Sequence, residues 1–234
     1  YEIGVRLVGS EMCIRDSNTA KNEQTDTWFK GLDRVYNNFV YDYLYPNPAS
    51  VLAFIENHDT DRFLGEGENL DMLKQASTLL LTTRRIPQLY YGTEVMMNGV
   101  KSKSDGYVRK DFPGGWADDK ENALTPEGRT RLQNESYNFY RNLLNWRKGN
   151  DVIAKGSMKQ FMVQHGVYAY ARQYKGKTVF VLLNGTDKEV KLPLKYYAEV
   201  LKDKTQGKDV ISGKVTALNE ELTMAPRQSM VIEL

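Results

Sequence analysis

Residues 51–62 read VLAFIENHDTDR, in which five apolar side chains are followed directly by polar ones. A short continuous apolar run after proline and serine is typical of a strand that is covered on both faces. The polar run 56–62 leaves the C-terminal end of this strand. Parallel α/β folds carry their active sites at that edge, because the loops vary while the strands hold position. The stretch therefore predicts a buried parallel strand with a candidate site at its end.

The segments on either side predict a strand–helix–strand unit. Residues 69–83 indicate a helix, and residues 86–91 a second short strand that Gly92 ends. This order is that of a βαβ unit, which builds parallel sheets. An earlier helix is expected over residues 25–45, before prolines 46 and 48, because apolar residues recur there at helical spacing: Trp28, Leu32, Val35, Phe39 and Tyr43.

Residues 98–124 form a long polar stretch, and loops of this length are usually functional or disordered. After it, Thr125 and Pro126 predict the start of a further helix, with threonine as the cap and proline at the first position. Gly149 is expected to end that helix.

The pattern changes from Asp151 onward, where short apolar or alternating runs are separated by turn signals such as Gly166, Gly176 and Gly213. Strands are expected at residues 161–163, 167–174, 178–183, 189–192 and 229–234. Many short strands at close spacing predict an antiparallel sandwich, with a domain boundary near Gly149.

Composition excludes several classes of partner. Hydrophobic residues make up 41% and charged residues 26%, which is ordinary for a globular protein. A net charge of +2, from 32 basic and 30 acidic residues, gives no electrostatic reason to expect nucleic acid or an anionic membrane as partner. No apolar run approaches the roughly 18 residues that a membrane span needs.

The first seventeen residues are set apart. The peptide EMCIRDS at 11–17 resembles a translated sequencing-library adapter, so residues 1–17 are expected to be non-native. Cys13, the single cysteine, lies inside this segment. The rest of the chain therefore offers neither disulfides nor cysteine ligands for zinc.

Three ordered motifs carry a family resemblance. Residues 54–59 (FIENHD) are similar to the motif at the seventh barrel strand of the α-amylase family of glycoside hydrolases, and residues 85–94 (RIPQLYYGTE) resemble its eighth strand. Residues 109–116 (RKDFPGGW) resemble the loop that follows in the neopullulanase and cyclomaltodextrinase branch. The strands after Asp151 resemble the family's C-terminal domain, so the match runs from about residue 25 to the end.

The resemblance implies an α/β plus all-β fold. Residues 18–150 would be the C-terminal part of a (β/α)8 TIM barrel, with its last strands and helices, and residues 151–234 an antiparallel β-sandwich domain. The family cleaves α-glucosidic bonds with retention, using an Asp nucleophile, a Glu acid/base and a second Asp that stabilises the transition state.

The resemblance also assigns site residues. Asp59 matches the stabilising Asp, whose hydrogen bonds to sugar hydroxyls tighten as the ring flattens. His58 matches the histidine that donates to the same sugar, and Asn57 in the same motif is expected to contact substrate. Asp105 and Arg109 resemble a pair that helps to hold the next sugar.

Simpler interpretations stay open for the same residues. Asn57 and Asp59 could cap a turn by bonding local backbone, and Asp105 with Arg109 could be a surface ion pair of little energetic value. The stretch 112–116 could stack a glucose ring or form a Gly-Gly turn with a buried Trp116. Glu94 is expected to be structural.

The chain departs from the family pattern upstream. A complete barrel needs roughly 250 residues, and no strands carrying the nucleophile and acid/base are seen before residue 25. We therefore expect this chain alone to lack glycosidase activity. We also expect the barrel part to be unstable in isolation because its sheet edges are exposed, while the sandwich could fold independently.

Other functions were weighed. A non-catalytic α-glucan-binding module or decayed remnant is the main alternative. A metal-dependent hydrolase would use His58, Asp59 and Asp61, and a minimal carboxylate pair would use Asp59 with Glu94.

No cofactor or metal is expected, and the structural calcium possible in the family lacks a matching ligand cluster. The expected partner is an α-glucan. The sequence leaves oligomeric state open, and a periplasmic or secreted bacterial location fits the neopullulanase-like character.

Overall fold

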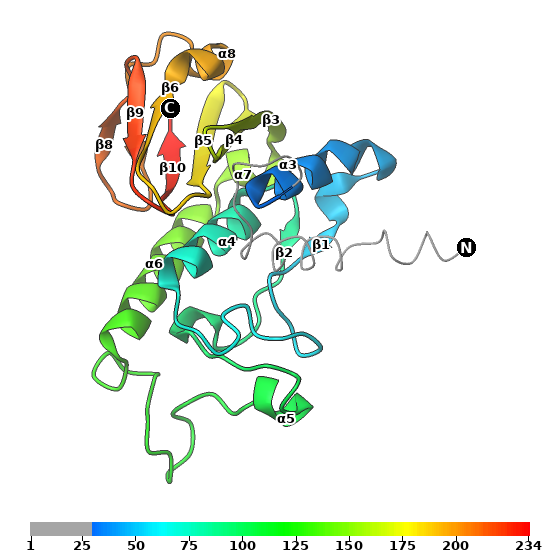
Figure 1. The fold of residues 1–234 in the computed structure, drawn as a ribbon, viewed down its shortest axis with the longest axis vertical. Helices are drawn as coiled ribbons and strands as arrows, with labels where there is room; N and C mark the ends of the chain where they lie inside the picture. Colours follow the sequence, from blue (N-terminus) through cyan, green and yellow to red (C-terminus); the bar gives the residue numbers. More distant parts are fainter. Residues whose placement is uncertain (1–29) are drawn as a thin grey trace.

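The computed structural model describes residues 30–234. Residues 1–17 and the first residues of the helix expected at Thr25 lie outside this described part. The antiparallel sheets lie at one end of the molecule, and the helices and loops around a short parallel sheet lie at the other (Figure 1). No helix in the described range is long and apolar enough to cross a bilayer.

The predicted βαβ unit is present. Strand β1 (Leu52–Ala53) pairs in parallel with β2 (Ile86–Pro87), and helix α4 (Leu70–Thr82) connects them. The side chain of Asn69 caps α4 by accepting from the Met72 N–H at 3.0 Å. The parallel sheet has only these two strands in residues 30–234, so the described chain does not itself form a barrel.

Two expected elements are shorter than the sequence pattern indicates. Helix α3 covers Leu32–Val40, and the chain then tightens into the 3-10 turn η1 (Tyr41–Leu44). Because a 3-10 turn advances three residues per turn, Tyr43 leaves the buried stripe and is 77% exposed. The strand expected to reach residue 91 stops at Pro87, and Gly92 adopts φ +81° before the turn η3 (Thr93–Val95).

The polar stretch after β2 contains one unexpected helix, α5 (Asp105–Val108). Helix α6 (Arg131–Arg147) begins later than expected, because Thr130 and Gln133 form a capping box. Thr125 instead closes a turn by accepting from the Gly128 N–H. Gly149, at φ +80°, follows the end of α6 as predicted.

The region after Gly149 is dominated by antiparallel sheets, as expected. It begins with helix α7 (Asp151–Lys155), which sequence reasoning missed. The larger sheet has the order β3-β4-β5-β10-β7-β8, and β6 pairs with β9. The bounds are β3 Ser157–Gln164, β4 Val167–Tyr174, β5 Lys177–Asn184, β6 Val190–Pro193, β7 Gln206–Asp209, β8 Val215–Ala217, β9 Glu221–Met224 and β10 Ser229–Glu233. Short helical turns are η2 (Pro48–Ser50), η4 (Leu194–Tyr197) and α8 (Ala198–Leu201).

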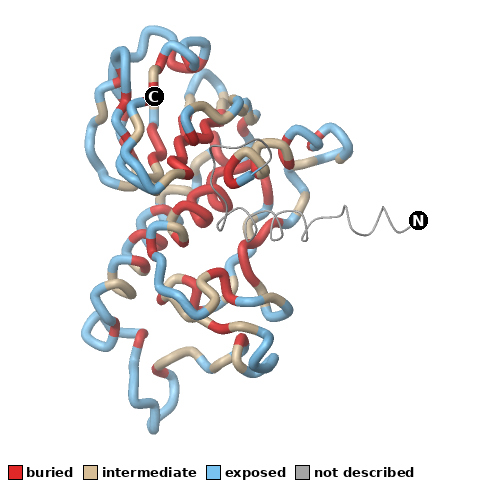
Figure 2. The backbone as a smooth tube through the Cα atoms, viewed as in Figure 1, coloured by how far each residue is buried: buried red, intermediate tan, exposed pale blue. Residues whose placement is uncertain are grey.

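The central strands β4, β5 and β10 are buried on both faces (Figure 2). Alternate residues such as Ala169 and Leu182 pack toward β6, β9 and the η4–α8 turn. The residues between them, such as Tyr168 and Val181, pack against α3, α4 and α7. The two parts of the chain therefore share a core, and one face of the sheet is covered by α3 and α4 of the first part together with α7.

Buried polar groups also join the two parts. Arg172 is 1% exposed and donates to the carbonyl oxygens of Thr82 (2.8 Å), Ile153 (2.9 Å), Gly156 (2.8 Å) and Ser157 (3.2 Å). Burial lowers the pKa of its guanidinium to about 10. One cation thus satisfies carbonyls at the ends of α4 and α7 and at the start of β3.

Candidate functional site

The candidate site lies where β1 and β2 end. Asp59 sits in the loop after β1, and Arg109 follows α5 in the long loop after β2. Arg109 Nη2 lies 3.2 Å from Asp59 Oδ1 and 3.1 Å from Asp105 Oδ2, and Asp59 Oδ2 lies 3.1 Å from His58 Nε2. We call His58, Asp59, Asp105 and Arg109 the ion-pair cluster. The structure thus brings four of the five predicted site residues together, although the two loops are about 50 residues apart.

The fifth predicted residue, Asn57, shapes the turn. Its Oδ1 accepts from the Asp59 N–H at 2.8 Å, and its own N–H donates to Thr60 Oγ1 at 3.0 Å. The capped-turn interpretation is therefore right for Asn57. This structural role of Asn57 is compatible with a binding site, since the turn leaves the side chains of His58 and Asp59 62% and 63% exposed.

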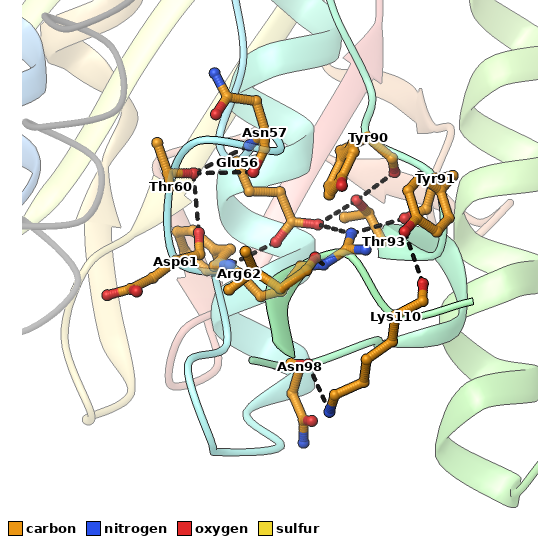
Figure 3. A network of polar contacts seen from close by, with 12 residues as sticks. Glu56, Asn57, Thr60, Asp61, Arg62, Tyr90, Tyr91, Thr93, Asn98 and Lys110 are labelled. Atoms are coloured by element: carbon orange, nitrogen blue, oxygen red, sulfur yellow. Dashed lines mark hydrogen bonds and ion pairs between the residues drawn. The ribbon is translucent and has the colours of Figure 1, made fainter. Parts of the chain in front are cut away.

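A buried ion pair is formed within the loop that also contains Asp59 (Figure 3). Glu56 is 2% exposed and Arg62 fully buried, with Arg62 Nη1 3.2 Å from Glu56 Oε1. The Glu56 carboxylate also accepts from the Phe63 N–H and from the Thr93 hydroxyl. Such a pair is tolerated in the interior because its remaining oxygens are satisfied by further donors.

Arg62 connects the loop after β1 to the loop after β2. It donates to the carbonyl oxygens of Tyr91 (2.7 Å) and Val108 (3.1 Å), and its guanidinium lies 4.0 Å from the ring centroid of Tyr90. Val108 is adjacent to Arg109 of the ion-pair cluster. The buried pair therefore positions the loop of Asp59 and the loop of Arg109 relative to each other.

Lys101 was missed by sequence reasoning. Its backbone N–H donates to Asp61 Oδ1 at 2.6 Å, while its Nζ contacts the Asp59 carbonyl at 3.0 Å and Asp105 Oδ1 at 3.4 Å. It lies in the polar loop, where neither periodicity nor a motif marks it. Only the folded arrangement shows that a second cation supports the cluster.

The ion-pair cluster offers carboxylate acceptors beside guanidinium and imidazole donors, all accessible to solvent. Such a mixture can hydrogen-bond a polyhydroxylated ligand. Within residues 30–234 no group of three or more His, Cys, Asp or Glu side chains is placed to hold a metal ion. Asp61, which the metal-dependent alternative requires, is bonded to the Lys101 N–H.

The loop beyond Arg109 corrects one expectation. Trp116 is 70% exposed, so the turn with a buried Trp is wrong. Asp119 Oδ2 instead accepts from the N–H groups of Gly114 (3.0 Å), Gly115 (2.8 Å) and Trp116 (3.0 Å). These backbone donors hold the pKa of the Asp119 carboxyl below its usual value.

Comparisons with known proteins identify relatives of the chain. Residues 158–233 match the Cyclo-malto-dextrinase C-terminal domain family. An alpha-amylase from Niallia circulans is 29% identical over 203 residues, which are 83% of this chain and 34% of that protein. A cyclomaltodextrin glucanotransferase from Thermoanaerobacterium thermosulfurigenes is 32% identical over 162 residues, 69% of this chain and 20% of that protein.

The fold matches solved structures as well. An Anoxybacillus alpha-amylase superposes with a TM-score of 0.74 at 18% identity, covering 94% of this chain and 45% of that structure. The match includes the βαβ unit as well as the antiparallel sheets, since it covers nearly all of the chain. The chain spans about a third or less of the sequence relatives and under half of this structure.

Proposed function

Because this chain belongs to the α-amylase family, we propose that it is part of a retaining glycoside hydrolase that acts on α-1,4-glucosidic bonds of an α-glucan of the starch, maltodextrin or pullulan type. In this proposal residues 18–150 are the last strands and helices of the catalytic (β/α)8 barrel. Residues 151–234 are its C-terminal β-sandwich domain. The observation that carries the proposal is the ion-pair cluster at the C-terminal edge of β1 and β2.

The uncovered face of the parallel sheet supports the barrel assignment. Leu52 and Ile86 are register partners, and they are 41% and 49% exposed. Ala53, the next residue of β1, is only 2% exposed and packs in the cluster that includes α4. A parallel sheet is normally covered on both faces. Two apolar partners on a bare face are therefore what the inner surface of a barrel would leave when its other strands are absent.

Asp59 would stabilise the transition state. Its carboxylate is accessible, and its backbone is fixed by Asn57 and Lys101. An acceptor held in advance next to the reacting carbon strengthens its bonds to sugar hydroxyls as positive charge develops on the ring. Arg109 and Asp105 would hold the neighbouring sugar, and His58 would donate to the same sugar as Asp59.

The nucleophile and the acid/base of this chemistry would come from strands outside residues 30–234. Without those two carboxylates the double displacement cannot run. We therefore expect the 234-residue chain to bind malto-oligosaccharides without cleaving them.

The test combines turnover with binding. The pure chain is incubated with starch and reducing sugar is measured, and maltoheptaose binding is followed by calorimetry for the wild type and Asp59→Asn. Asp187→Asn is the matched control, since Asp187 is also an exposed carboxylate paired with an arginine, Arg227, at 2.7 Å. We expect no sugar release and binding that Asp59→Asn weakens about tenfold or more. Sugar release by the chain alone, or equal effects of the two substitutions, would refute the assignment.

A further inference from the structure

The turn formed by residues 113–119 presents an aromatic ring to solvent in the part of the chain that the structure describes. Trp116 is 70% exposed, although burying so large an apolar side chain is strongly favourable. We infer that Trp116 is a stacking platform for a glucose ring of a bound α-glucan, at a position beyond the ion-pair cluster. This inference rests on the proposed function, and it adds a contact that the family motif at residues 54–59 does not include.

Hydrogen bonds fix the backbone of the turn that carries this ring. Three consecutive N–H groups, from Gly114 to Trp116, converge on one oxygen of Asp119. The Pro113 carbonyl accepts from the Ala123 N–H at 2.8 Å and ties the turn to the segment that follows it. A side chain at Gly114, which has φ +93°, would also collide with the backbone of Asn122.

Ordering this turn costs conformational entropy, and an exposed tryptophan without a binding role would not offset that cost. Ordering the backbone of a surface loop opposes folding, and here the ordered backbone carries a ring that contributes little burial to the described chain. A backbone that is ordered before binding loses less entropy when a ligand stacks on the ring that it carries. The arrangement therefore favours binding over packing as the role of Trp116.

The surroundings point to a sugar more than to a protein surface. Asp118, Lys120 and Glu121 are all exposed and follow Trp116 within five residues of the chain. Charged residues are depleted from the buried centres of protein interfaces, where a tryptophan would normally sit. A glucose ring instead offers C–H groups to the indole face and hydroxyls to these charged neighbours.

The chain also limits how far the ring can lie from the site. Trp116 follows Arg109 by seven residues, so their Cα atoms are at most about 25 Å apart. Both belong to the loop that leaves α5 (Figure 1). A malto-oligosaccharide of several units could therefore contact the ion-pair cluster and Trp116 together, whereas maltose would be too short if the two are well separated.

The test follows ligand binding at Trp116 and at the ion-pair cluster in the same experiment. The 15N-labelled chain is titrated with maltose and with maltoheptaose, and two NMR signals are followed: the Trp116 indole N–H, assigned through Trp116→Phe, and the Arg109 Nε–H. If both shift, the inference and the proposed function are both supported. If only Arg109 shifts, the inference is wrong and the proposed function stands. If only Trp116 shifts, the inference stands and the assigned site is wrong; if neither shifts, both are wrong.

Affinity measurements give a second criterion. We expect Trp116→Ala to weaken maltoheptaose binding about three- to tenfold and Trp116→Phe to weaken it less, because the phenyl ring keeps part of the stacking face. Tyr43→Ala is the matched control, since Tyr43 is an aromatic residue that is 77% exposed elsewhere. Asp119→Ala, which keeps the indole and removes the acceptor that orders the backbone of the turn, should also weaken binding. An unchanged affinity in Trp116→Ala would overturn the inference.

Discussion

The parallel unit β1–α4–β2 and the antiparallel sheet are stabilised in different ways. The strands β1 and β2 are two residues long, and one face of their sheet is bare. In the antiparallel sheet, β4 and β5 are eight residues long and are buried on both faces. The first region has an apolar cluster around α4 and α6 and, in addition, buried polar groups that tie its loops together, whereas the second is held mainly by apolar packing.

This difference separates stability from function. The loops tied by Glu56 and Arg62 carry the exposed ion-pair cluster, and loops on a fixed scaffold are where binding residues usually lie. The sheet has few exposed polar groups on its central strands and covers the helices instead. Substitutions in the two regions should therefore have effects of different origin and size.

The largest effect is expected at the buried ion pair. Arg62→Met leaves the Glu56 carboxylate buried without its cation, and we expect the free energy of unfolding to fall by about 3–5 kcal/mol. The midpoint of urea unfolding measures it. Arg227→Met, which breaks a pair whose Asp187 partner is exposed, should cost at most about 1 kcal/mol. Adding Glu56→Gln to Arg62→Met should restore part of the loss, and equal losses in the two single variants would show that burial of the pair does not matter.

The same substitution in both regions tests the contrast directly. Leu182→Ala empties a fully buried position in β5 and should cost about 2–5 kcal/mol. Leu52→Ala, on the bare face of β1, should change the free energy of unfolding by only about 0.5 kcal/mol. Both are measured by urea unfolding of the 234-residue chain. A large loss at Leu52 would mean that another surface covers this face in solution.

The smallest effect concerns the contact between α4 and α6. Lys74 Nζ lies 2.5 Å from Glu135 Oε1, and this hydrogen bond, together with the charge of Lys74, lowers the pKa of Glu135 from its usual 4.5. A carboxyl whose folded-state pKa is lowered stabilises the fold above the unfolded value, and this stabilisation is lost as the pH falls through the lowered pKa. We expect a contribution of about 0.2–1 kcal/mol that is present above pH 4.5.

Lys74→Met should remove this acid dependence. The urea midpoint is measured between pH 3 and pH 6, with Lys191→Met, an exposed lysine on β6, as the control. High salt should reduce the difference between wild type and Lys74→Met, because it screens the attraction. A pH profile that Lys74→Met leaves unchanged would assign the acid dependence to other carboxyls.

Hydrophobic periodicity predicted helices and strands best where buried side chains recur at a regular spacing. Strand β4 has the predicted bounds of 167–174, and α4 was placed to within a residue at each end, because packing fixes every second or every third to fourth side chain. Strands β7, β8 and β9 were missed, since they are only three or four residues long, which is too short for an alternating pattern to be recognised. The start of α6 was wrong because Thr130 with Gln133 forms a better cap than Thr125.

The candidate site was predictable only through its motifs. Asp59 and Arg109 were named from the resemblance, and nothing in their spacing required the contact of 3.2 Å that the fold creates. The contacts of Lys101 and the hydrogen bonds that Asp119 accepts from backbone N–H groups depend on backbone positions, and hydrophobic periodicity does not predict these positions. The roles of these residues in binding stay predictions until the titrations above are made.

The contacts of Arg172 bear on how chimeric proteins of this type should be joined. Its guanidinium gathers the carbonyls of Thr82 and Ile153 along with two at the start of β3, so it belongs to the helices as much as to the sheet. Exchanging residues 150–234 alone for those of a relative would leave the Thr82 carbonyl on the other side of a junction at Gly149, the point where the sequence places a boundary, while the other three acceptors would be exchanged together with position 172. A crossover placed before α4 keeps all four acceptors with their donor, and a lysine at position 172, with three N–H groups instead of five, could not replace it.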